Sequence, residues 1–369
     1  MLKLNYYKNK KVLITGHAGF KGAWLSLALK TLGAKIYGVS KEIKTKPSFY
    51  IEIKNIFIKS IFMDIYDYKK LEIIIKRIKP DFIFHLAGQS LVIDSYNEPL
   101  NTFKTNTMGT INILNILKEL NLKTTAIFIT SDKVYDNQNQ NKKFVESDKL
   151  GINDPYSASK TLAEYAINLY FKTFLKKKSS KIRIGIARAG NVIGGGDWND
   201  NRLIPDCIKS WVKNKKVVIR NKNSTRPWQH VLEPIFGYLI FALNIKKSIL
   251  NNGQALNFGP MQDQNYKVGE IIKLLSKRWG RGQYNFKKTD DYYESILLSL
   301  NIKKAKKIID WSPVLEVKKT INLTIDWYKC YYFSRKNILT LSKAQIFEYL
   351  QIVNKKNEKY KNKKIRSRI

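Results

Sequence analysis

The sequence is poor in residues that mark several common classes of protein. Its 369 residues include two cysteines, Cys207 and Cys330, which stand far apart without a CxxC or CxxH neighbour. That spacing argues against a disulfide framework and a zinc site, favours a reducing compartment and leads us to predict no metal. No apolar run approaches the roughly 20 residues that span a bilayer, and residues 1–10 show no secretory signal pattern. We therefore expect a cytoplasmic protein.

Acidic residues are also scarce, since 29 Asp and Glu face 67 Lys and Arg and leave a formal net charge of +38. Such a charge would normally suggest a nucleic-acid binder. However, 44% of the residues are hydrophobic and 12% are aromatic, which predicts a buried core. Only 11 of the basic residues are Arg, whereas phosphate contacts favour the Arg fork. The Lys excess is typical of a genome-wide codon preference, and we expect neither a nucleic-acid nor a membrane partner.

Short apolar runs alternate with helix-length amphipathic stretches over residues 1–190. This alternation predicts an α/β fold, a Rossmann-type doubly wound parallel sheet with crossover helices. Beyond it the pattern loosens, which predicts a smaller mixed C-terminal lobe over 191–335, with some chain returning to the core, and a basic tail over 336–369. The predicted strands are Lys11–Thr15, Lys35–Val39, Ile56–Met63, Asp81–Leu86, Thr124–Thr130 and Lys181–Arg188, and the predicted helices are Trp24–Leu32, Tyr68–Ile78, Leu100–Leu120 and Ser157–Leu175.

A glycine-rich turn follows the first predicted strand, in the segment Thr15–Gly22 (TGHAGFKG). Gly16, Gly19 and Gly22 are evenly spaced, and Phe20 lies at the start of the helical stretch behind them. A turn without Cβ atoms lets backbone N–H groups approach a pyrophosphate at a helix N-terminus, as in dinucleotide-binding folds. The G-x-x-G-x-x-G spacing therefore predicts a dinucleotide site, with a plain strand-to-helix turn as the alternative.

The residues at the ends of the second and third predicted strands bear on whether the dinucleotide is NAD or NADP. An acidic ribose ligand is absent after the second strand, where Val39 is followed by Ser40 and Lys41, so NADP is conceivable beside NAD. Asp64, followed by Ile65 directly after the third strand, is placed to reach an adenine amine. Its alternative role is that of a helix N-cap.

A Tyr-x-x-x-Lys pair stands at Tyr156 and Lys160 on a predicted long helix. This spacing places the phenol and the ammonium on one helix face, where the Lys charge can lower the pKa of the phenol toward that of a general base. The pair alone is a weak signal. With the preceding Asp154-Pro155, the glycine turn and Ser131 at the end of the fifth strand, it resembles the constellation of the extended short-chain dehydrogenases/reductases.

The segment Thr130–Tyr135 (TSDKVY) narrows the reaction. It resembles a segment that has the sequence Thr-Asp-Glu in nucleotide-sugar 4,6-dehydratases. In this chain Ser131 stands where those proteins have Thr, Asp132 matches their Asp, and Lys133 stands where they have Glu. An epimerase or a simple reductase needs only the hydroxyl here. A dehydratase needs an added acid and base to remove the C5 proton and release the C6 hydroxyl. A solvent-exposed Asp-Lys pair at a strand end is the alternative.

A set of motifs between about residue 7 and residue 333 resembles the CDP-glucose 4,6-dehydratases. The resemblance implies an NAD-dependent hydro-lyase that converts CDP-glucose to CDP-4-dehydro-6-deoxyglucose, in deoxysugar synthesis for surface polysaccharide such as lipopolysaccharide O-antigen. It also implies a homo-oligomer, a dimer or tetramer, built on the helices around 100–120 and 157–175. Leu86 and Ala87 would line the cofactor, and Gln89 would contact the substrate. Ile93 departs from the family, where Arg is usual. The motifs are Thr15–Trp24 (TGHAGFKGAW), His85–Gln89 (HLAGQ), Thr130–Tyr135, Ala187–Asp206 (ARAGNVIGGGDWNDNRLIPD), Arg226–Pro234 (RPWQHVLEP) and Asn257–Pro260 (NFGP).

The substrate side rests on residues between 191 and 230. The glycine loop 194–197 can approach a ligand closely because three of its residues lack a Cβ atom. Arg202 and Arg226 are assigned to the pyrophosphate of a sugar nucleotide, since the guanidinium fork is the preferred partner of a diphosphate. Asn191 is the expected polar contact at the mouth. His230 either hydrogen-bonds the nucleotide or is a structural histidine. Trp198 and Trp228 either stack on the ligand or, as we expect, pack in the core. His17 and His85 are expected either to support residues that contact the ligand or to be structural.

These residues together predict one mechanism. Tyr156 takes the C4 hydroxyl proton while hydride leaves C4 for NAD, and Ser131 hydrogen-bonds the same oxygen. Asp132 is the expected acid and Lys133, acting in its neutral form, the expected base for the loss of water. Two other functions stay open. One is a UDP-hexose 4-epimerase or nucleotide-sugar reductase on the same scaffold, and the other is an inactive basic relative that binds RNA or membranes.

Overall fold

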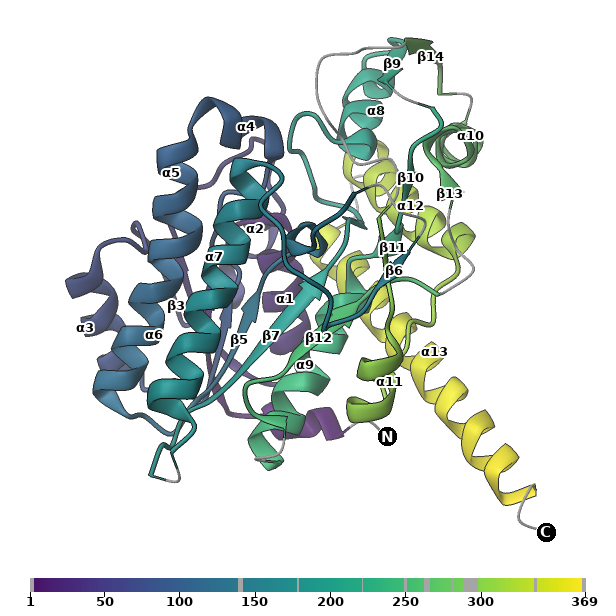
Figure 1. Cartoon of the computed structure of the whole chain (residues 1–369). Helices are drawn as coiled ribbons and strands as arrows, with labels where there is room; N and C mark the ends of the chain where they lie inside the picture. Colours follow the sequence, from purple (N-terminus) through teal and green to yellow (C-terminus); the bar gives the residue numbers. More distant parts are fainter. Residues whose placement is uncertain are drawn as a thin grey trace.

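The computed structural model describes residues 3–138, 142–177, 179–220, 222–248, 251–261, 266–280, 282–287, 298–334 and 337–366. Within these residues a seven-stranded parallel sheet has the order β12-β7-β5-β4-β1-β2-β3 (Figure 1). The predicted Rossmann-type α/β fold is confirmed. The sheet consists of β1 (Lys11–Thr15), β2 (Lys35–Ser40), β3 (Lys59–Phe62), β4 (Phe82–His85), β5 (Thr125–Ile129), β7 (Arg183–Ala189) and β12 (Ala255–Phe258).

The predicted strands are all present, with small shifts at their ends. β1 lies between β2 and β4, and Thr15 pairs with Val39 on one side and with His85 on the other. The carboxyl ends of these strands therefore meet at one edge of the sheet. Open α/β sheets bind their ligands at that edge.

Helices cover both faces of the sheet, so its central strands are apolar on both sides. In β1, Val12 and Ile14 belong to one apolar core, whereas Leu13 belongs to the core on the opposite face. Successive side chains of a strand point to opposite faces, and one apolar run thus serves both cores. The first face packs against α1 (Phe20–Thr31), α9 (Leu232–Lys247), α12 (Val317–Phe333) and α13 (Ile338–Arg366), and the second against α3 (Tyr68–Ile78), α6 (Gly109–Leu120) and α7 (Pro155–Tyr170).

Local sequence signals set the ends of the helices near the sheet edge. α7 begins with Pro155 in its first turn after the N-cap Asp154, whose side chain accepts the Ser157 N–H at 2.8 Å in a capping box. The predicted helix 157–175 is α7 followed by a π-helical turn, η5 (Phe171–Leu175). The predicted helix 100–120 is α5 (Pro99–Phe103), a π-helical turn η3 (Lys104–Met108) and α6.

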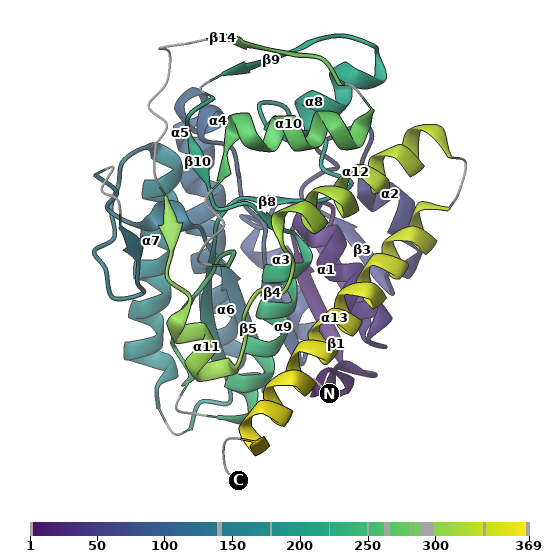
Figure 2. The same ribbon diagram turned by 90° about the vertical axis from the view of Figure 1, so that its right-hand side faces the viewer.

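The chain after β7 forms most of a smaller mixed lobe beside the carboxyl edge of the sheet (Figure 2). α12 packs against α10 and against the strand pair β8 and β11, and β12 returns to the sheet beside β7. The elements here are β8 (Val192–Ile193), α8 (Leu203–Val212), β9 (Val217–Arg220), β10 (Thr225–Arg226), β11 (Gln229–His230), β13 (Tyr266–Lys267), α10 (Val268–Trp279) and β14 (Tyr284–Lys287). Shorter elements elsewhere are η1 (Lys3–Tyr7), α2 (Phe49–Ile53), η2 (Lys54–Ile56), α4 (Val92–Asn97), η4 (Asp132–Val134), β6 (Lys143–Phe144), β15 (Ser299–Leu300) and α11 (Lys303–Ile309).

The segment 336–369 differs from the predicted basic tail, because residues 338–366 form helix α13. Ile338, Ile346 and Tyr349 are buried, and α13 runs along α1 and α2 (Figure 2). Apolar residues at helical spacing in the first half of this helix bury one of its faces. The Lys-rich composition of the whole segment conceals that face in the sequence.

Candidate active site

A cleft of about 1000 Å³ lies at the carboxyl edge of the sheet, between the strand ends and the smaller lobe. Its lining joins the glycine turn, the ends of β2, β3, β4 and β5, the start of α7 and the loop after β7. The position agrees with the general rule for open α/β sheets. Of the predicted site residues, the cleft brings together Gly16, Gly19, Phe20, Gly22, Asp64, Ile65, Leu86, Ala87, Gln89, Ser131, Asp132, Lys133, Tyr156, Lys160, Asn191 and Arg202.

The turn between β1 and α1 leaves no room for a side chain at Gly16 or at Gly22. Gly16 has φ +79°, and a Cβ atom there would lie 2.7 Å from the backbone nitrogen of Ala87. A Cβ atom on Gly22 would overlap the Gly16 carbonyl. Gly19 is the N-cap of α1, so the unpaired N–H groups of the first helical turn are at the cleft. This turn fits a dinucleotide pyrophosphate.

The ends of β2 and β3 bring Lys41 and Asp64 together at the cleft, with 3.3 Å between Lys41 Nζ and the Asp64 carboxylate. Asp64 also accepts the Tyr66 N–H at 3.0 Å. The N-cap of α3 is Asp67, whose side chain accepts the Lys70 N–H. The alternative role of Asp64 as helix N-cap is therefore wrong, and its carboxylate is available to an adenine amine.

Ser40, at the end of β2, holds the glycine turn. Its hydroxyl accepts the Ala18 N–H at 3.0 Å and lies 2.9 Å from His17 Nδ1. His17 Nε2 lies 2.6 Å from the Ser60 hydroxyl on β3. Burial lowers the pKa of His17 to about 4, so the ring is neutral near pH 7. His17 is structural, as expected.

Tyr156 and Lys160 lie one turn apart in α7, and each is 8% exposed. Burial raises the pKa of Tyr156 to about 12, and a hydrogen bond with Ser131 opposes that shift. Burial lowers the pKa of Lys160 to about 8, against the attraction of the Glu164 carboxylate. In the chain alone the loss of water outweighs the hydrogen bond with Ser131, and Lys160 is not among the groups that shift the pKa of Tyr156.

Asp132 and Lys133 follow Ser131 in η4. The Lys133 N–H donates to Ser131 Oγ at 3.2 Å, and Ser131 Oγ donates to Asp132 Oδ1 at 3.2 Å. Asp132 is 2% exposed, and its charge raises the pKa of Tyr156. The alternative of a solvent-exposed Asp-Lys pair is therefore wrong for Asp132. Ser131, Asp132 and Tyr156 form one cluster of polar groups in the cleft.

Two polar residues, Lys21 in the cleft lining and Asn106 buried behind it, escaped the sequence reasoning. Lys21 lies inside the glycine turn, where burial, followed by the charge of Arg202, lowers its pKa to about 8 and the Asp132 carboxylate opposes the shift. Asn106, on the π-helical turn η3, donates to the Gln89 carbonyl at 3.1 Å and to Ser159 Oγ at 2.9 Å. A charged residue within a turn of small and apolar residues could have identified Lys21 as a residue of the site. Nothing in the sequence predicted the π-helical turn that carries Asn106.

Asn106 and Lys160 both lie against Gly88. A Cβ atom on Gly88 would lie 2.7 Å from Asn106 Oδ1 and 2.8 Å from Lys160 Nζ, so both atoms are close to the Gly88 backbone. Asn106 Oδ1 is buried and has no hydrogen-bond partner among the described residues. Such an unpaired buried acceptor is uncommon in folded proteins. π-helical turns occur frequently at functional sites.

Arg202 reaches into the cleft from the loop before α8. Its guanidinium donates to the Asp197 carboxylate at 2.9 Å and to the Ser90 hydroxyl at 3.2 Å, which joins the lobe to the segment after β4. Asn191 is exposed at the same cleft. Both residues lie where a substrate anion could meet them. Arg226 is on β10, and its side chain lies outside the part of the chain that the structure describes.

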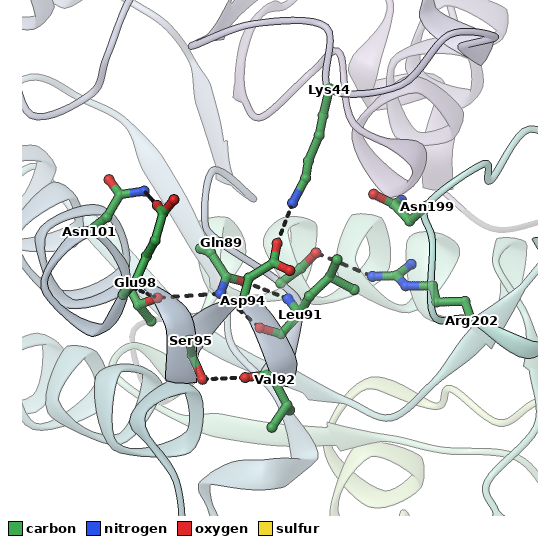
Figure 3. A network of polar contacts seen from close by, with 12 residues as sticks. Lys44, Gln89, Leu91, Val92, Asp94, Ser95, Glu98, Asn101, Asn199 and Arg202 are labelled. Atoms are coloured by element: carbon green, nitrogen blue, oxygen red, sulfur yellow. Dashed lines mark hydrogen bonds and ion pairs between the residues drawn. The ribbon is translucent and has the colours of Figure 1, made fainter. Parts of the chain in front are cut away.

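Gln89 shapes the turn that faces Arg202 (Figure 3). Its amide donates to the Leu91 carbonyl at 2.7 Å and accepts the Leu91 N–H, so the side chain holds the turn before α4. Across the cleft from Arg202, Lys44 donates to Asp94 of α4 at 2.8 Å (Figure 3). Ile93, the departure from the resembled family, lies on α4 and lines the cleft.

His230 is not part of the cleft lining, which differs from its predicted contact with the nucleotide. It is fully buried on β11, its ring packs edge-on against Trp24 at 6.1 Å, and burial lowers its pKa to about 3. The pairing of β11 with β8 holds the ring in the core. His85 is also structural, since its ring bonds to Thr15 and Thr110 on either side.

The two tryptophans pack, as expected. Trp198 is 3% exposed against Trp327 and Tyr328, and its Nε1 donates to Tyr332 at 3.0 Å. Trp228 is 5% exposed and donates to the Tyr266 carbonyl at 3.1 Å. Neither indole nitrogen is left for a ligand.

Among the described residues no group of three or more His, Cys, Asp or Glu side chains could hold a metal ion. No helix in this part of the chain is long and apolar enough to cross a membrane.

Comparisons of the sequence with known proteins point to sugar-nucleotide enzymes. Residues 13–324 match the model of the GDP-mannose 4,6-dehydratase family. A CDP-glucose 4,6-dehydratase of Salmonella typhimurium is 36% identical over 355 residues, which cover 95% of this chain and 99% of that protein. A UDP-glucose 4-epimerase of Mycoplasma genitalium is 25% identical over 87% of this chain and 97% of its own length.

Comparisons of the structure give the same fold. A UDP-glucuronic acid 4-epimerase of Bacillus cereus, solved with UDP-glucuronic acid and NAD, superposes with a TM-score of 0.74 at 25% identity and covers 87% of this chain and all of its own. A dTDP-glucose 4,6-dehydratase of Bacillus anthracis, solved with NAD, superposes with a TM-score of 0.72 at 21% identity over 86% of this chain and 96% of its own.

Proposed function

Because the chain belongs to the GDP-mannose 4,6-dehydratase family of the extended short-chain dehydrogenases/reductases, we propose that it dehydrates a sugar nucleotide at C5 and C6. The proposed substrate is CDP-glucose and the product CDP-4-dehydro-6-deoxyglucose. The similarity to the Salmonella protein over nearly the full length of both chains supports this choice. One observation carries the reaction type, namely that Asp132 and Lys133 line the same cleft as Tyr156 and Lys160.

NAD is the proposed cofactor, and the residues present fit it. The glycine turn would hold the pyrophosphate on backbone N–H groups, and Asp64 would accept from the adenine amine. Tyr156 and Lys160 would lie at the nicotinamide end, with Leu86 and Ala87 along the cleft wall. When bound there, NAD would supply the hydride acceptor for C4 and the hydride donor for C6. The NAD held by the 25%-identical epimerase structure supports NAD over the NADP that the end of β2 left open.

Tyr156 takes the proton of the C4 hydroxyl. Its hydrogen bond with Ser131 opposes the effect of burial on its pKa. To donate to the C4 oxygen, Ser131 has to turn its single hydroxyl proton away from Asp132. Lys160, one helical turn further along the same face of α7, is proposed to share in holding the negative charge at Tyr156 once a cationic nicotinamide is bound, since burial keeps the pKa of Tyr156 high in the chain alone. Both groups are largely buried, each 8% exposed, where they line the cleft.

Asp132 and Lys133 carry the elimination in this proposal. Once C4 is a ketone, the C5 proton is acidic, and Lys133 removes it in its neutral form. Asp132 has to hold a proton at this step, which it gives to the C6 hydroxyl as it leaves as water, and exchange with solvent restores that proton after the cycle. The contact of Asp132 with Ser131 at 3.2 Å supports this order, since it keeps the acid beside the group that holds the C4 oxygen.

The sugar nucleotide is proposed to bind through its diphosphate. Arg202 lies at the cleft with its guanidinium on Asp197, and Arg226 is the second proposed partner of the diphosphate. Asn191 and Gln89 are proposed to contact the sugar, from the two sides of the cleft. A bound diphosphate would replace the Asp197 carboxylate as the ion partner of Arg202. Asp197 therefore competes with the substrate for the Arg202 guanidinium.

The wider setting is also a proposal. The chain is proposed to act in the cytoplasm, in deoxysugar synthesis for surface polysaccharide, and as a homodimer. Exposed apolar residues at one face of α7, Leu162, Tyr165 and Leu169, support an interface there, as does Leu100 on α5, which is 81% exposed. Sedimentation velocity of the purified chain tests the dimer. A monomer at micromolar concentration would contradict it.

The experiment that tests the function is an incubation of the purified chain with CDP-glucose and NAD. We expect a product lighter by one water, with the alkaline absorbance of a 4-keto-6-deoxy sugar and no net NADH. A product that keeps its C6 oxygen and differs only at C4 would select the epimerase instead.

A further inference from the structure

A buried ion pair lies directly beneath the proposed catalytic residues. Glu164 of α7 and Arg188 of β7 are 0% and 3% exposed, and the guanidinium binds the carboxylate through Nε at 2.9 and 3.0 Å. Burial of two charges costs several kcal/mol each, and a well-packed apolar pair of similar volume is often as stable. Stability alone therefore gives no reason for this pair.

The ion pair contacts both ends of the catalytic turn. Thr130, the residue before Ser131, donates its hydroxyl to Glu164 Oε1 at 2.6 Å. Tyr135, the residue after η4, lies with its hydroxyl 2.9 Å from Arg188 Nη1. Both side chains are buried. Charge-assisted hydrogen bonds of this kind are shorter and stronger than those between neutral groups.

One member of the pair, Glu164, also belongs to the helix that carries the proposed catalytic residues. Tyr156, Lys160 and Glu164 follow one another at a spacing of four residues in α7 and therefore lie on one face of the helix. The Glu164 charge reaches Lys160, whose pKa it raises against the effect of burial. A carboxylate that holds Thr130 thus fixes the distance between the helix that carries the phenol and the turn that carries Ser131.

A further contact extends the pair to β12. The Tyr135 hydroxyl donates to Asn257 Oδ1 at 2.7 Å, and Asn257 donates to the Phe144 carbonyl at 3.0 Å. Arg188 Nη1 also donates to the Glu146 carbonyl at 3.2 Å. The turn is therefore held from β5, β7, β12 and α7 at once.

We propose that the Glu164–Arg188 pair is a positioning device that holds the turn 131–133 in register with the catalytic face of α7. The inference rests on the proposed function, since it assigns these residues to the elimination and oxidation steps. Neither side chain touches the reacting atoms. Loss of one contact lets the turn shift, which misplaces Ser131 and Asp132 relative to Tyr156.

Thr130→Val tests the positioning role of the Glu164–Arg188 pair, because it removes the hydroxyl that donates to Glu164 and keeps the shape of the side chain. We expect kcat to fall about 10- to 100-fold, as small misplacements of catalytic groups do, with little change in KM. Thr130→Ser restores the hydroxyl and should restore most of kcat. Thr324→Val is the matched control, since Thr324 is fully buried and its hydroxyl bonds within α12 to the Thr320 carbonyl at 2.8 Å.

Tyr135→Phe tests the other end of the turn. It removes the hydroxyl that joins Arg188 to Asn257, and we expect the same loss of kcat at little change in KM. Tyr7→Phe is its control, because Tyr7 is equally buried and its hydroxyl donates to the Leu239 carbonyl at 2.8 Å, outside the cleft lining. Melting temperatures measured beside kcat separate a loss of stability from a loss of position.

Amide hydrogen exchange gives a readout that needs no turnover. The Lys133 N–H donates to Ser131 Oγ, and the Tyr135 N–H donates to the Asp132 carbonyl at 3.4 Å. Exchange over 131–135 should be faster in Thr130→Val and Tyr135→Phe than in the two controls. Equal exchange and equal kcat in variants and controls would overturn the inference. If the unmodified chain fails to dehydrate CDP-glucose, the proposed function fails, and the exchange result still decides the positioning role.

Discussion

The substitution Asp132→Asn separates the elimination from the oxidation. Asp132 is 2% exposed, and its carboxylate accepts from Ser131 at 3.2 Å. An Asn amide has the same shape and still accepts from Ser131, so the turn 131–133 should keep its fold. The amide cannot supply the proton that the C6 hydroxyl needs. We therefore expect dehydration to slow by about 10²- to 10⁴-fold, the usual contribution of a general acid.

The oxidation at C4, the first step of the proposed reaction, should still take place in Asp132→Asn. The Asp132 charge raises the pKa of Tyr156, so its removal lowers that pKa and extends phenolate formation toward lower pH. Substrate should then reduce bound NAD without completing the cycle, and the absorbance of NADH should accumulate in a single turnover. The unmodified chain should show only a small transient.

Asp136→Asn is the control for this experiment. Asp136 lies a few residues further along the chain, pairs with Lys149 at 3.0 Å and is not among the cleft-lining residues. It should dehydrate at the rate of the unmodified chain. Full dehydration by Asp132→Asn at neutral pH, with no accumulation of NADH, would refute Asp132 as the acid.

Three further predictions follow from the same structure. Gly22→Ala should abolish NAD binding in a fluorescence titration, because the new Cβ overlaps the Gly16 carbonyl; unchanged affinity would show that the turn does not hold the cofactor. Burial raises the pKa of Glu233 from 4.5 to about 7. The unfolded chain therefore releases this proton at lower pH than the folded chain, and between pH 4.5 and about 7 the protein should lose up to about 3 kcal/mol of stability from this group. Glu233→Gln should remove that loss in urea unfolding at several pH values, and an equal pH dependence in both proteins would contradict the assignment. With a net charge of +38, the chain should capture a doubly negative sugar nucleotide faster at low salt. kcat/KM should thus fall as ionic strength rises, and a flat salt profile would exclude steering.

The strands and the glycine turn could be predicted from the sequence because their signals are local. A parallel strand covered on both faces is a short apolar run, as in Lys11–Thr15, and its bounds match β1. The turn after β1 needs residues without a Cβ atom, and Gly16 and Gly22 lie where the backbone allows none. The capping box of Asp154 likewise marks the start of α7.

The rest depends on contacts between distant segments. His230 stands in a motif of the resembled family, but only the packing of β11 beneath Trp24 shows that its ring is buried. The raised pKa of Tyr156 follows from burial that no local pattern reveals. Glu164 resembles a surface acid in the sequence, and its role depends on Arg188, which reaches it from another element. The apolar half of α13 is hidden by the Lys residues around it.

The central claim is that this chain removes water from a sugar nucleotide without net redox change. The most direct measurement is the mass of the product formed from CDP-glucose in deuterated water with catalytic NAD, read by mass spectrometry beside the absorbance of NADH. The account predicts loss of the C6 oxygen, one solvent deuterium at C5 and no net NADH. A product that keeps the C6 oxygen, or NADH formed in proportion to product, would contradict it.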